Sequence, residues 1–216
     1  LPFFYGYVVV GASFFIMVVM VGAVNAYGVF FKPMLTEFNW SRGMTSGAVS
    51  VYHIVRGVLG IAMGGLTDRF GPRTVLTLCG IVVGLGYLLL SQINAIWQLY
   101  LFYGLIVGGG LSGTYSPLVS TVARWFASRR SMMTGIMVAG AGVGTMIIPP
   151  IVSLFIATYG WRVSYIILGG MISVIVVIAT QFLKRDPAQM GQVAYEKGIR
   201  EESRLTAGSG ASSLRQ

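Results

Sequence analysis

Arg56 is the residue whose position most restricts what this chain can do. It lies twelve residues before Asp68, about 18 Å along a helix, within an otherwise apolar segment. A charge at that depth in a lipid bilayer costs at least about 2.5 kcal/mol, so it should face a partner, a water-filled cavity or an anionic ligand. His53, one turn earlier on the same face, could relay a proton, because histidine titrates near neutral pH, or it could be a hydrogen-bonded packing residue.

A second concentration of charge lies in the segment GGLTDRFGPR, residues 64–73, between two long apolar stretches. Gly71 permits a positive backbone angle and Pro72 suits the first turn of a helix, so we expect a tight turn between two helices here. Asp68 could accept hydrogen bonds from helix amino ends or from a nearby arginine. The pattern therefore predicts a polar contact that holds helix ends together at a membrane surface.

Hydrogen-bonding side chains within apolar stretches are further candidates for ligand binding. Asn25 and Tyr115 lie within such stretches, and we favour Tyr115 as a ligand-binding residue over its alternative as a packing residue. Lys32 precedes Pro33 at the end of the first stretch, where a lysine alone is typical of an anchor that reaches the interface. The stretches contain no zinc-ligand spacing, no serine and histidine pair with a third group, and no aspartate dyad. We therefore predict no metal, no cofactor and no catalysis.

The composition indicates a membrane protein. Hydrophobic residues make up 55% of the 216 residues and charged residues 10%, which leaves too little polar surface to coat a water-soluble globule. The formal charge of +9 could suggest a nucleic-acid partner. However, the basic residues lie at the ends of apolar stretches and in the C-terminal segment, a distribution typical of membrane topology. We therefore predict a lipid bilayer around the chain and no nucleic-acid partner.

Six apolar stretches are long enough to cross about 30 Å of hydrocarbon as helices. They cover residues 4–31, 44–66, 74–91, 96–123, 132–158 and 163–183. Strands of a membrane barrel would be about half as long and would alternate polar with apolar residues. The sequence therefore predicts an all-α membrane protein, with a bundle of six transmembrane helices in residues 1–183.

The lysine and arginine residues indicate the orientation, because cytoplasmic connections retain positive charge. With a cytoplasmic start, the inner connections hold Arg69, Arg73, Arg124, Arg129, Arg130, Lys184 and Arg185, and the outer ones hold Lys32, Arg42 and Arg162. We therefore expect both ends in the cytoplasm and the bundle in the cell (inner) membrane. Residues 184–216 mix both signs of charge with Gly and Ser, so we expect a cytoplasmic linker or tail, with an amphipathic helix over 194–205 as the alternative.

The sequence also contains an internal repeat. YGVFFKPMLTEFNWSRGMTSG from Tyr27 aligns with YSPLVSTVARWFASRRSMMTG from Tyr115, and after a shift of one residue FGPR at Phe70 aligns with YGWR at Tyr159. The two copies of a duplicated three-helix unit enter the membrane from opposite sides. We therefore predict a 3+3 inverted repeat, the arrangement of many secondary transporters, with chance similarity of apolar segments as the alternative.

The charged turn resembles the major facilitator superfamily, whose loop between helices two and three has the form G-x-L-A-D-R-x-G-R-K. The matching residues are Gly64, Leu66, Asp68, Arg69, Gly71 and Arg73, whereas Thr67 and Pro72 depart from the pattern. The resemblance implies that the helices are half of a twelve-helix transporter. It also implies that the turn is a cytoplasmic gate motif in which Asp68 pairs with nearby charges, with Arg124 as the local candidate.

Two further segments are similar to the monocarboxylate transporter family. WFASRRSMMTGIMVAGAGVG, residues 125–144, resembles the family signature Y-F-x-K-R-x-x-L-A-x-G-x-A-x-A-G-x-x-x-G. It matches at Phe126, Arg129 or Arg130, Gly135, Ala139, Gly140 and Gly144, and departs at Trp125, Ser128 and Met133. Lys32 follows an apolar GVFF run, as does the lysine that this family uses in proton and anion handling. The departures allow a related organic-anion carrier with a different substrate.

These features together predict a secondary active transporter that moves a small organic anion, a monocarboxylate such as lactate or pyruvate, with a proton. Its expected mechanism is alternating access, with substrate binding by Arg56, Tyr115, Lys32, His53 and Asn25. A second six-helix half, from the same gene product or a dimer mate, would complete the pathway. The alternatives are an anion exchanger of the oxalate/formate type, another carrier of the superfamily, and a membrane receptor or scaffold.

Overall fold

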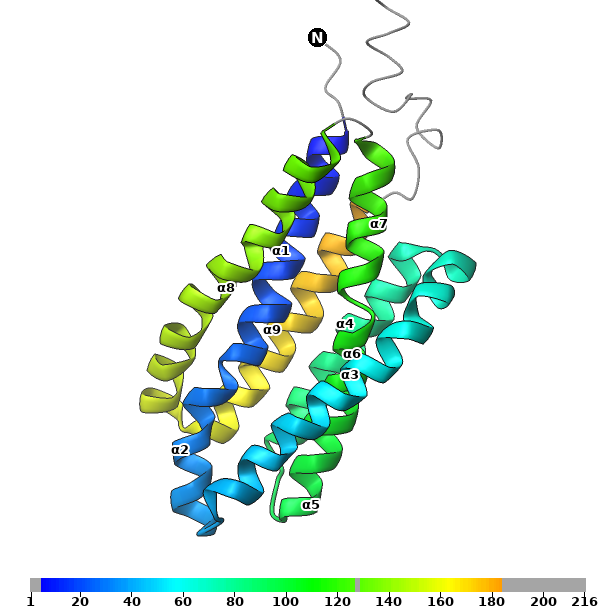
Figure 1. The fold of residues 1–216 in the computed structure, drawn as a ribbon. Helices are drawn as coiled ribbons and strands as arrows, with labels where there is room; N and C mark the ends of the chain where they lie inside the picture. The colour runs from blue at the N-terminus through cyan, green and yellow to red at the C-terminus, as the bar shows by residue number, and fades with distance from the viewer. Residues whose placement is uncertain (1–4, 127–128, 184–216) are drawn as a thin grey trace, which may run out of the picture.

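The apolar stretches of the sequence are helical in the structure. The computed structural model describes residues 5–126 and 129–183, and within these ranges it contains helices and turns but no strand. The all-α prediction is confirmed, whereas the predicted tail, residues 184–216, lies outside the described residues. Figure 1 shows the helices side by side, with successive long helices running in opposite directions.

Within the described ranges, five helical stretches are long and apolar enough to span a membrane. They are Gly6–Phe38, which consists of α1 (Gly6–Asn25) and α2 (Tyr27–Phe38), then α3 (Arg42–Phe70), α4 (Pro72–Leu90), α8 (Arg130–Tyr159) and α9 (Trp161–Gln181). Most of these bounds lie within a few residues of the predicted ones. The exception is α2, which continues to Phe38, beyond the predicted end at Phe31.

The fourth predicted span, residues 96–123, is divided into several helical segments, which corrects the prediction of a single transmembrane helix there. It consists of α5 (Ile96–Leu99), the π-helix η1 (Tyr100–Val107), α6 (Gly108–Ser112) and α7 (Tyr115–Trp125). Glycine favours a helix less than other residues do, and the glycines at 108–110 and 113 are where α6 begins and ends. The segments still follow one another from one end of the bundle to the other, as the green ribbons of Figure 1 show.

Glycines allow the closest helix contacts. α1 packs along α8, where a Cβ on Gly140 would lie 2.5 Å from the carbonyl oxygen of Phe14. α4 packs along α9, where a Cβ on either Gly84 or Gly169 would lie 2.8 Å from the carbonyl oxygen of the other. α3 packs along η1 and α6. Small residues thus let the backbones approach closely, as is typical of helices that pack in lipid.

Two connections between long helices have the same backbone form. Gly71 ends α3 with φ 83° and ψ 156°, and Gly160 ends α8 with φ 81° and ψ 162°. The N–H of each glycine donates to a carbonyl four residues earlier, that of Thr67 at 2.9 Å and that of Ile156 at 3.0 Å. A positive φ favours glycine at both positions. The turn expected at Gly71 is therefore present, and Gly160 forms a second turn of the same kind.

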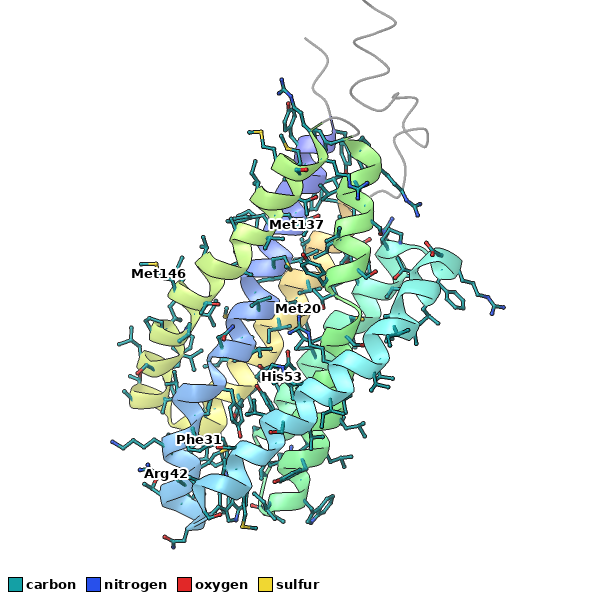
Figure 2. All side chains as sticks on the ribbon, in the orientation of Figure 1. Met20, Phe31, Arg42, His53, Met137 and Met146 are labelled. Atoms are coloured by element: carbon teal, nitrogen blue, oxygen red, sulfur yellow. The ribbon has the colours of Figure 1, made fainter. Side chains whose placement is uncertain are left out.

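Much of α3 and of α8 is exposed in the described structure. Ile61 on α3 is 85% exposed and Met146 on α8 is 80% exposed. Figure 2 shows Met146 pointing away from the bundle. Apolar side chains exposed over such long helices face lipid or further helices when the protein is in a membrane.

Candidate functional site

A pocket of about 230 Å³ lies between α1, α2, α3, η1 and α6. The polar side chains that line it are those of Asn25, Tyr27, Tyr52, His53, Arg56 and Tyr103. Figure 2 shows His53 in the middle part of the bundle, whereas Phe31 and Arg42 lie toward the end where α2 meets α3. The structure therefore brings three of the predicted site residues, Asn25, His53 and Arg56, into one cavity.

Arg56 is the middle residue of α3, with fourteen residues of the helix on either side. That position is about 21 Å from each helix end. Its Nη1 donates a hydrogen bond to Tyr52 Oη at 3.1 Å, one helical turn away, and Tyr52 is fully buried. Within the described part of the chain, no carboxylate pairs with Arg56. A planar guanidinium with spare N–H donors can bind a carboxylate through two parallel hydrogen bonds.

A buried tyrosine cluster supports this arginine. Tyr103 of η1 stacks on Tyr27 with ring centroids 4.2 Å apart, and its ring lies 5.4 Å from that of Tyr52. Tyr27 Oη donates to the Thr45 carbonyl at 3.1 Å, which ties the start of α2 to α3. The sequence analysis did not identify Tyr52 or Tyr103, because a tyrosine within an apolar stretch has the pattern of a packing residue. The spacing of four residues between Tyr52 and Arg56 was the available signal.

His53 and Asn25 form two other parts of the pocket wall. The ring of His53 meets that of Tyr52 edge to face, with centroids 4.9 Å apart, and His53 is exposed toward the cavity. Asn25 Nδ2 donates to the Val21 carbonyl at 2.8 Å and to Thr145 Oγ1 at 3.2 Å. Asn25 therefore connects α1 with α8 beside the pocket, while its carbonyl oxygen can accept a further hydrogen bond.

Lys32 and Tyr115 are not among the residues that line this pocket. Lys32 is exposed on α2, six residues beyond the turn at Ala26. Tyr115 is the first residue of α7 and is 47% exposed. Their predicted roles in substrate binding therefore gain no support from the arrangement of the pocket.

The charged turn brings α3, α4, α7 and α9 into polar contact at one end of the bundle. Asp68 Oδ1 lies 3.6 Å from Arg124 Nη2 of α7, and both side chains are substantially exposed. Arg73 donates to Gln181 of α9, and Thr77 and Thr180 form a hydrogen bond of 2.9 Å between α4 and α9. Two other motif residues make weaker contacts: the guanidinium of Arg69 lies over the Phe70 ring, and a Cβ on Gly64 would approach Ser116 Oγ at 3.9 Å.

The glycine-rich segment of α8 divides into two environments. Gly140 and Gly144 lie against α1, where a Cβ on Gly144 would collide with the Val18 backbone. A Cβ on Gly135 would meet nothing within 4 Å. Arg129 and Arg130 are exposed at the start of α8. The signature-like segment therefore combines a tight helix contact with a basic helix start.

The opposite end of the bundle carries a polar contact that the sequence analysis did not identify. Glu37 of α2 accepts hydrogen bonds from Trp161 Nε1, at 2.6 Å, and from Arg162, both on α9. Arg162 also donates to the Ile93 carbonyl at 3.3 Å. Acidic residues are rare in this sequence, and Glu37 is the first of them, followed by Asp68. That rarity of acidic residues was the available signal.

Comparison with known proteins identifies similar sequences over nearly the whole chain. The family model described as Major Facilitator Superfamily matches residues 13–214. Monocarboxylate transporter 13 of Rattus norvegicus is 28% identical over 167 residues, which are 77% of this chain and 39% of that protein. Monocarboxylate transporter 14 of Homo sapiens is 28% identical over 196 residues, which are 91% of this chain and 38% of that protein. The chain thus spans less than half the length of these relatives.

A solved structure has a similar fold. A bacterial homologue of the human lysosomal transporter Spinster, in an inward-facing and unoccupied conformation, superposes with a TM-score of 0.73 at 17% identity. The match covers 85% of this chain and 44% of that one.

Proposed function

The chain belongs to the major facilitator superfamily, and on that premise we propose that it is the N-terminal six-helix half of a twelve-helix carrier. It is an integral, multi-pass membrane protein of a carrier family related to monocarboxylate transporters, and not an enzyme. The half-length match to its relatives supports the larger assembly. The exposed apolar faces of α3 and of the later part of α8, which includes Met146 and Leu154, give the missing helices a surface to cover.

The six-helix half is built as a 3+3 inverted repeat in this proposal. The first unit contains α1 with α2, α3 and α4, and the second contains α5 to α7, α8 and α9. The equivalent turns at Gly71 and Gly160 support this assignment, because their φ and ψ angles differ by only a few degrees. Packing supports it too. In the two units α1 corresponds to the segment with η1 and α6, and α3 corresponds to α8. The contact of α1 with α8 is therefore equivalent to the contact of η1 and α6 with α3, and both contacts are present.

The substrate that the pocket suits best is a small monocarboxylate such as lactate or pyruvate. The observation that carries this proposal is the mid-helix guanidinium of Arg56, fixed by Tyr52 at 3.1 Å and without a carboxylate partner in the described ranges. A substrate carboxylate would supply that partner and offset the cost of a charge at this depth in the membrane. The pocket, at about 230 Å³, is smaller than the roughly 300–1,000 Å³ typical of sites for drug-sized ligands.

Proton coupling is assigned to His53 in this proposal. Its ring faces the same cavity as Arg56 and contacts Tyr52, so protonation would add a second positive charge beside a bound anion. Alternating access then follows from rocking of this half against the second one. Asp68 and Arg124 would hold the helix ends together at the cytoplasmic side in one of the two states.

Both ends of the chain are placed in the cytoplasm in this proposal. The end of the bundle at which α1 starts carries more basic residues than the other end, which favours a cytoplasmic location under the positive-inside rule. Its described basic residues are Arg69, Arg73, Arg124, Arg129 and Arg130, compared with Lys32, Arg42 and Arg162 at the opposite end.

The test is uptake of radiolabelled lactate into proteoliposomes that contain the full-length gene product, with and without an inward proton gradient. We expect gradient-driven uptake by the parent and its loss in Arg56→Gln, with partial retention in Arg56→Lys. Arg42→Gln, which removes an exposed arginine from the start of the same helix, is the matched control and should transport as the parent does.

Three outcomes would contradict parts of the proposal. A well-folded parent that takes up no lactate would remove the monocarboxylate assignment. Full uptake by Arg56→Gln would remove Arg56 from the pathway. Uptake that requires lactate inside the vesicles, and does not respond to the proton gradient, would favour the exchanger of the oxalate/formate type.

A further inference from the structure

Two grooves flank the outward face of α1 near its start. The groove between α1 and α9 has a volume of about 460 Å³ and is lined almost wholly by apolar groups, among them Val8, Phe15 and Ile178. The groove between α1 and α8 has a volume of about 590 Å³. Gly11 lines both grooves, and a Cβ there would meet nothing within 4 Å. The two grooves therefore lie on either side of one open strip of α1.

The grooves are confined to the depth of one membrane leaflet. Their lining on α1 runs from Tyr7 to Phe15, nine residues that span about 12 Å of helix, compared with about 15 Å for half of the hydrocarbon core. Phe15 is 61% exposed, whereas Ile16 and Met20 beyond it are fully buried. The buried residues beyond Phe15 close the grooves within one leaflet, a length that suits the acyl chains of a lipid.

One groove has a basic group among its apolar ones. Arg129 lines the groove between α1 and α8, together with Tyr7, Phe14, Met132 and Ile136, and the exposed Arg130 is adjacent in sequence. Arg73, which donates to Gln181 in the last turn of α9, and Arg124, in the last turn of α7, belong to the same end of the bundle. Basic pockets between transmembrane helices at the cytoplasmic side bind anionic lipid headgroups.

We propose that this surface is a binding site for one anionic phospholipid of the cytoplasmic leaflet. Its phosphate lies at Arg129, one acyl chain occupies each groove, and the chains pass on either side of Gly11. The site lies near the start of α1 and the pocket of Arg56 near its end, since α1 lines the grooves with residues from Tyr7 to Phe15 and lines the pocket with Val21, Val24 and Asn25. The proposal therefore holds whichever anion the carrier moves.

The test is native mass spectrometry of the full-length gene product, purified in mild detergent and titrated with dioleoyl phosphatidylglycerol. Dioleoyl phosphatidylcholine has the same chains but no net negative charge and serves as the lipid control. We expect one phosphatidylglycerol to be retained at least tenfold more strongly than phosphatidylcholine. Arg129→Gln should abolish most of that difference, and Gly11→Leu, which fills the strip between the grooves, should reduce retention of the first lipid.

Matched variants at the opposite end of the bundle serve as controls. Arg42→Gln removes an exposed arginine, and Gly43→Leu adds the same side chain where a Cβ meets nothing within 4 Å. Both should retain the lipid as the parent does. Equal retention of the two phospholipids by the parent, or unchanged retention by both Arg129→Gln and Gly11→Leu, would overturn the proposal. Binding of free inorganic phosphate that Gly11→Leu leaves intact would also overturn it, because it would show an anion site that needs no acyl chains.

Discussion

Gly140→Ala should weaken the contact between α1 and α8. The new Cβ would lie 2.5 Å from the Phe14 carbonyl oxygen, about 1 Å closer than an ordinary contact of roughly 3.5 Å. The helices would therefore have to separate by that amount, and overpacking of this kind costs about 1–3 kcal/mol. The alanine also favours the helix by about 1 kcal/mol over glycine. Because the clash is with backbone, which cannot rotate away as a flexible side chain can, the overpacking cost should lie in the upper half of that range, about 2–3 kcal/mol. The net loss should then be about 1–2 kcal/mol, which for a folding unit of roughly 150–250 residues corresponds to a fall in Tm of roughly 2–8 °C.

The assay is thermal unfolding of the full-length gene product in detergent, followed by intrinsic fluorescence. Gly135→Ala is the control, because it makes the same substitution on the same helix at a position where the Cβ meets nothing within 4 Å. Its Tm should stay the same or rise slightly. If Gly140→Ala melts with the parent, or if Gly135→Ala falls as far as Gly140→Ala does, the close approach of α1 and α8 at Gly140 is refuted.

Two further substitutions give results of different kinds. Asp68→Asn should change the free energy of unfolding by less than about 1 kcal/mol, because the pair of Asp68 with Arg124 is exposed. If the pair is a gate, the same substitution should slow lactate uptake in proteoliposomes. Unchanged uptake would contradict that role. Tyr87→Phe should leave Tm unchanged or raise it, because Tyr87 Oη is buried and has no hydrogen-bond partner in the described ranges. A clear fall in Tm would contradict this, because it would show that the hydroxyl has a partner.

The limits of most long helices could be predicted because the bilayer imposes a length on apolar segments. Residues 74–91 and 163–183, for example, become α4 at Pro72–Leu90 and α9 at Trp161–Gln181. The continuation of α2 to Phe38 was missed because hydropathy registers the end of the apolar run and not the end of the helix. The π-helix η1 was missed because its residues are uniformly apolar, and such a run does not reveal its hydrogen-bond register.

The candidate site could be predicted where a residue type is rare in its surroundings. Arg56, His53 and Asn25 are polar groups in apolar runs, and they share one pocket. Tyr103 lines the same pocket but belongs to a chain rich in buried aromatic residues, so nothing in the sequence distinguishes it. Lys32 was placed in the site by its resemblance to the family lysine that follows a GVFF run, a match in sequence that does not show where the side chain points; in the structure it is exposed on α2 and is not among the residues that line the pocket.

The weak packing of α3 has a consequence for biogenesis. A multi-pass protein is synthesised from its N-terminus, so α3 leaves the ribosome before the proposed second half exists. During that interval the helix has its central Arg56 beside a largely exposed face that the later helices are proposed to cover. We expect the translocon to retain this segment until its partners arrive, and a chain truncated after residue 183 to be a substrate for membrane quality control. The charge of Arg56, which is proposed to bind an anion, thereby makes stable insertion of α3 depend on prompt synthesis of the remaining helices.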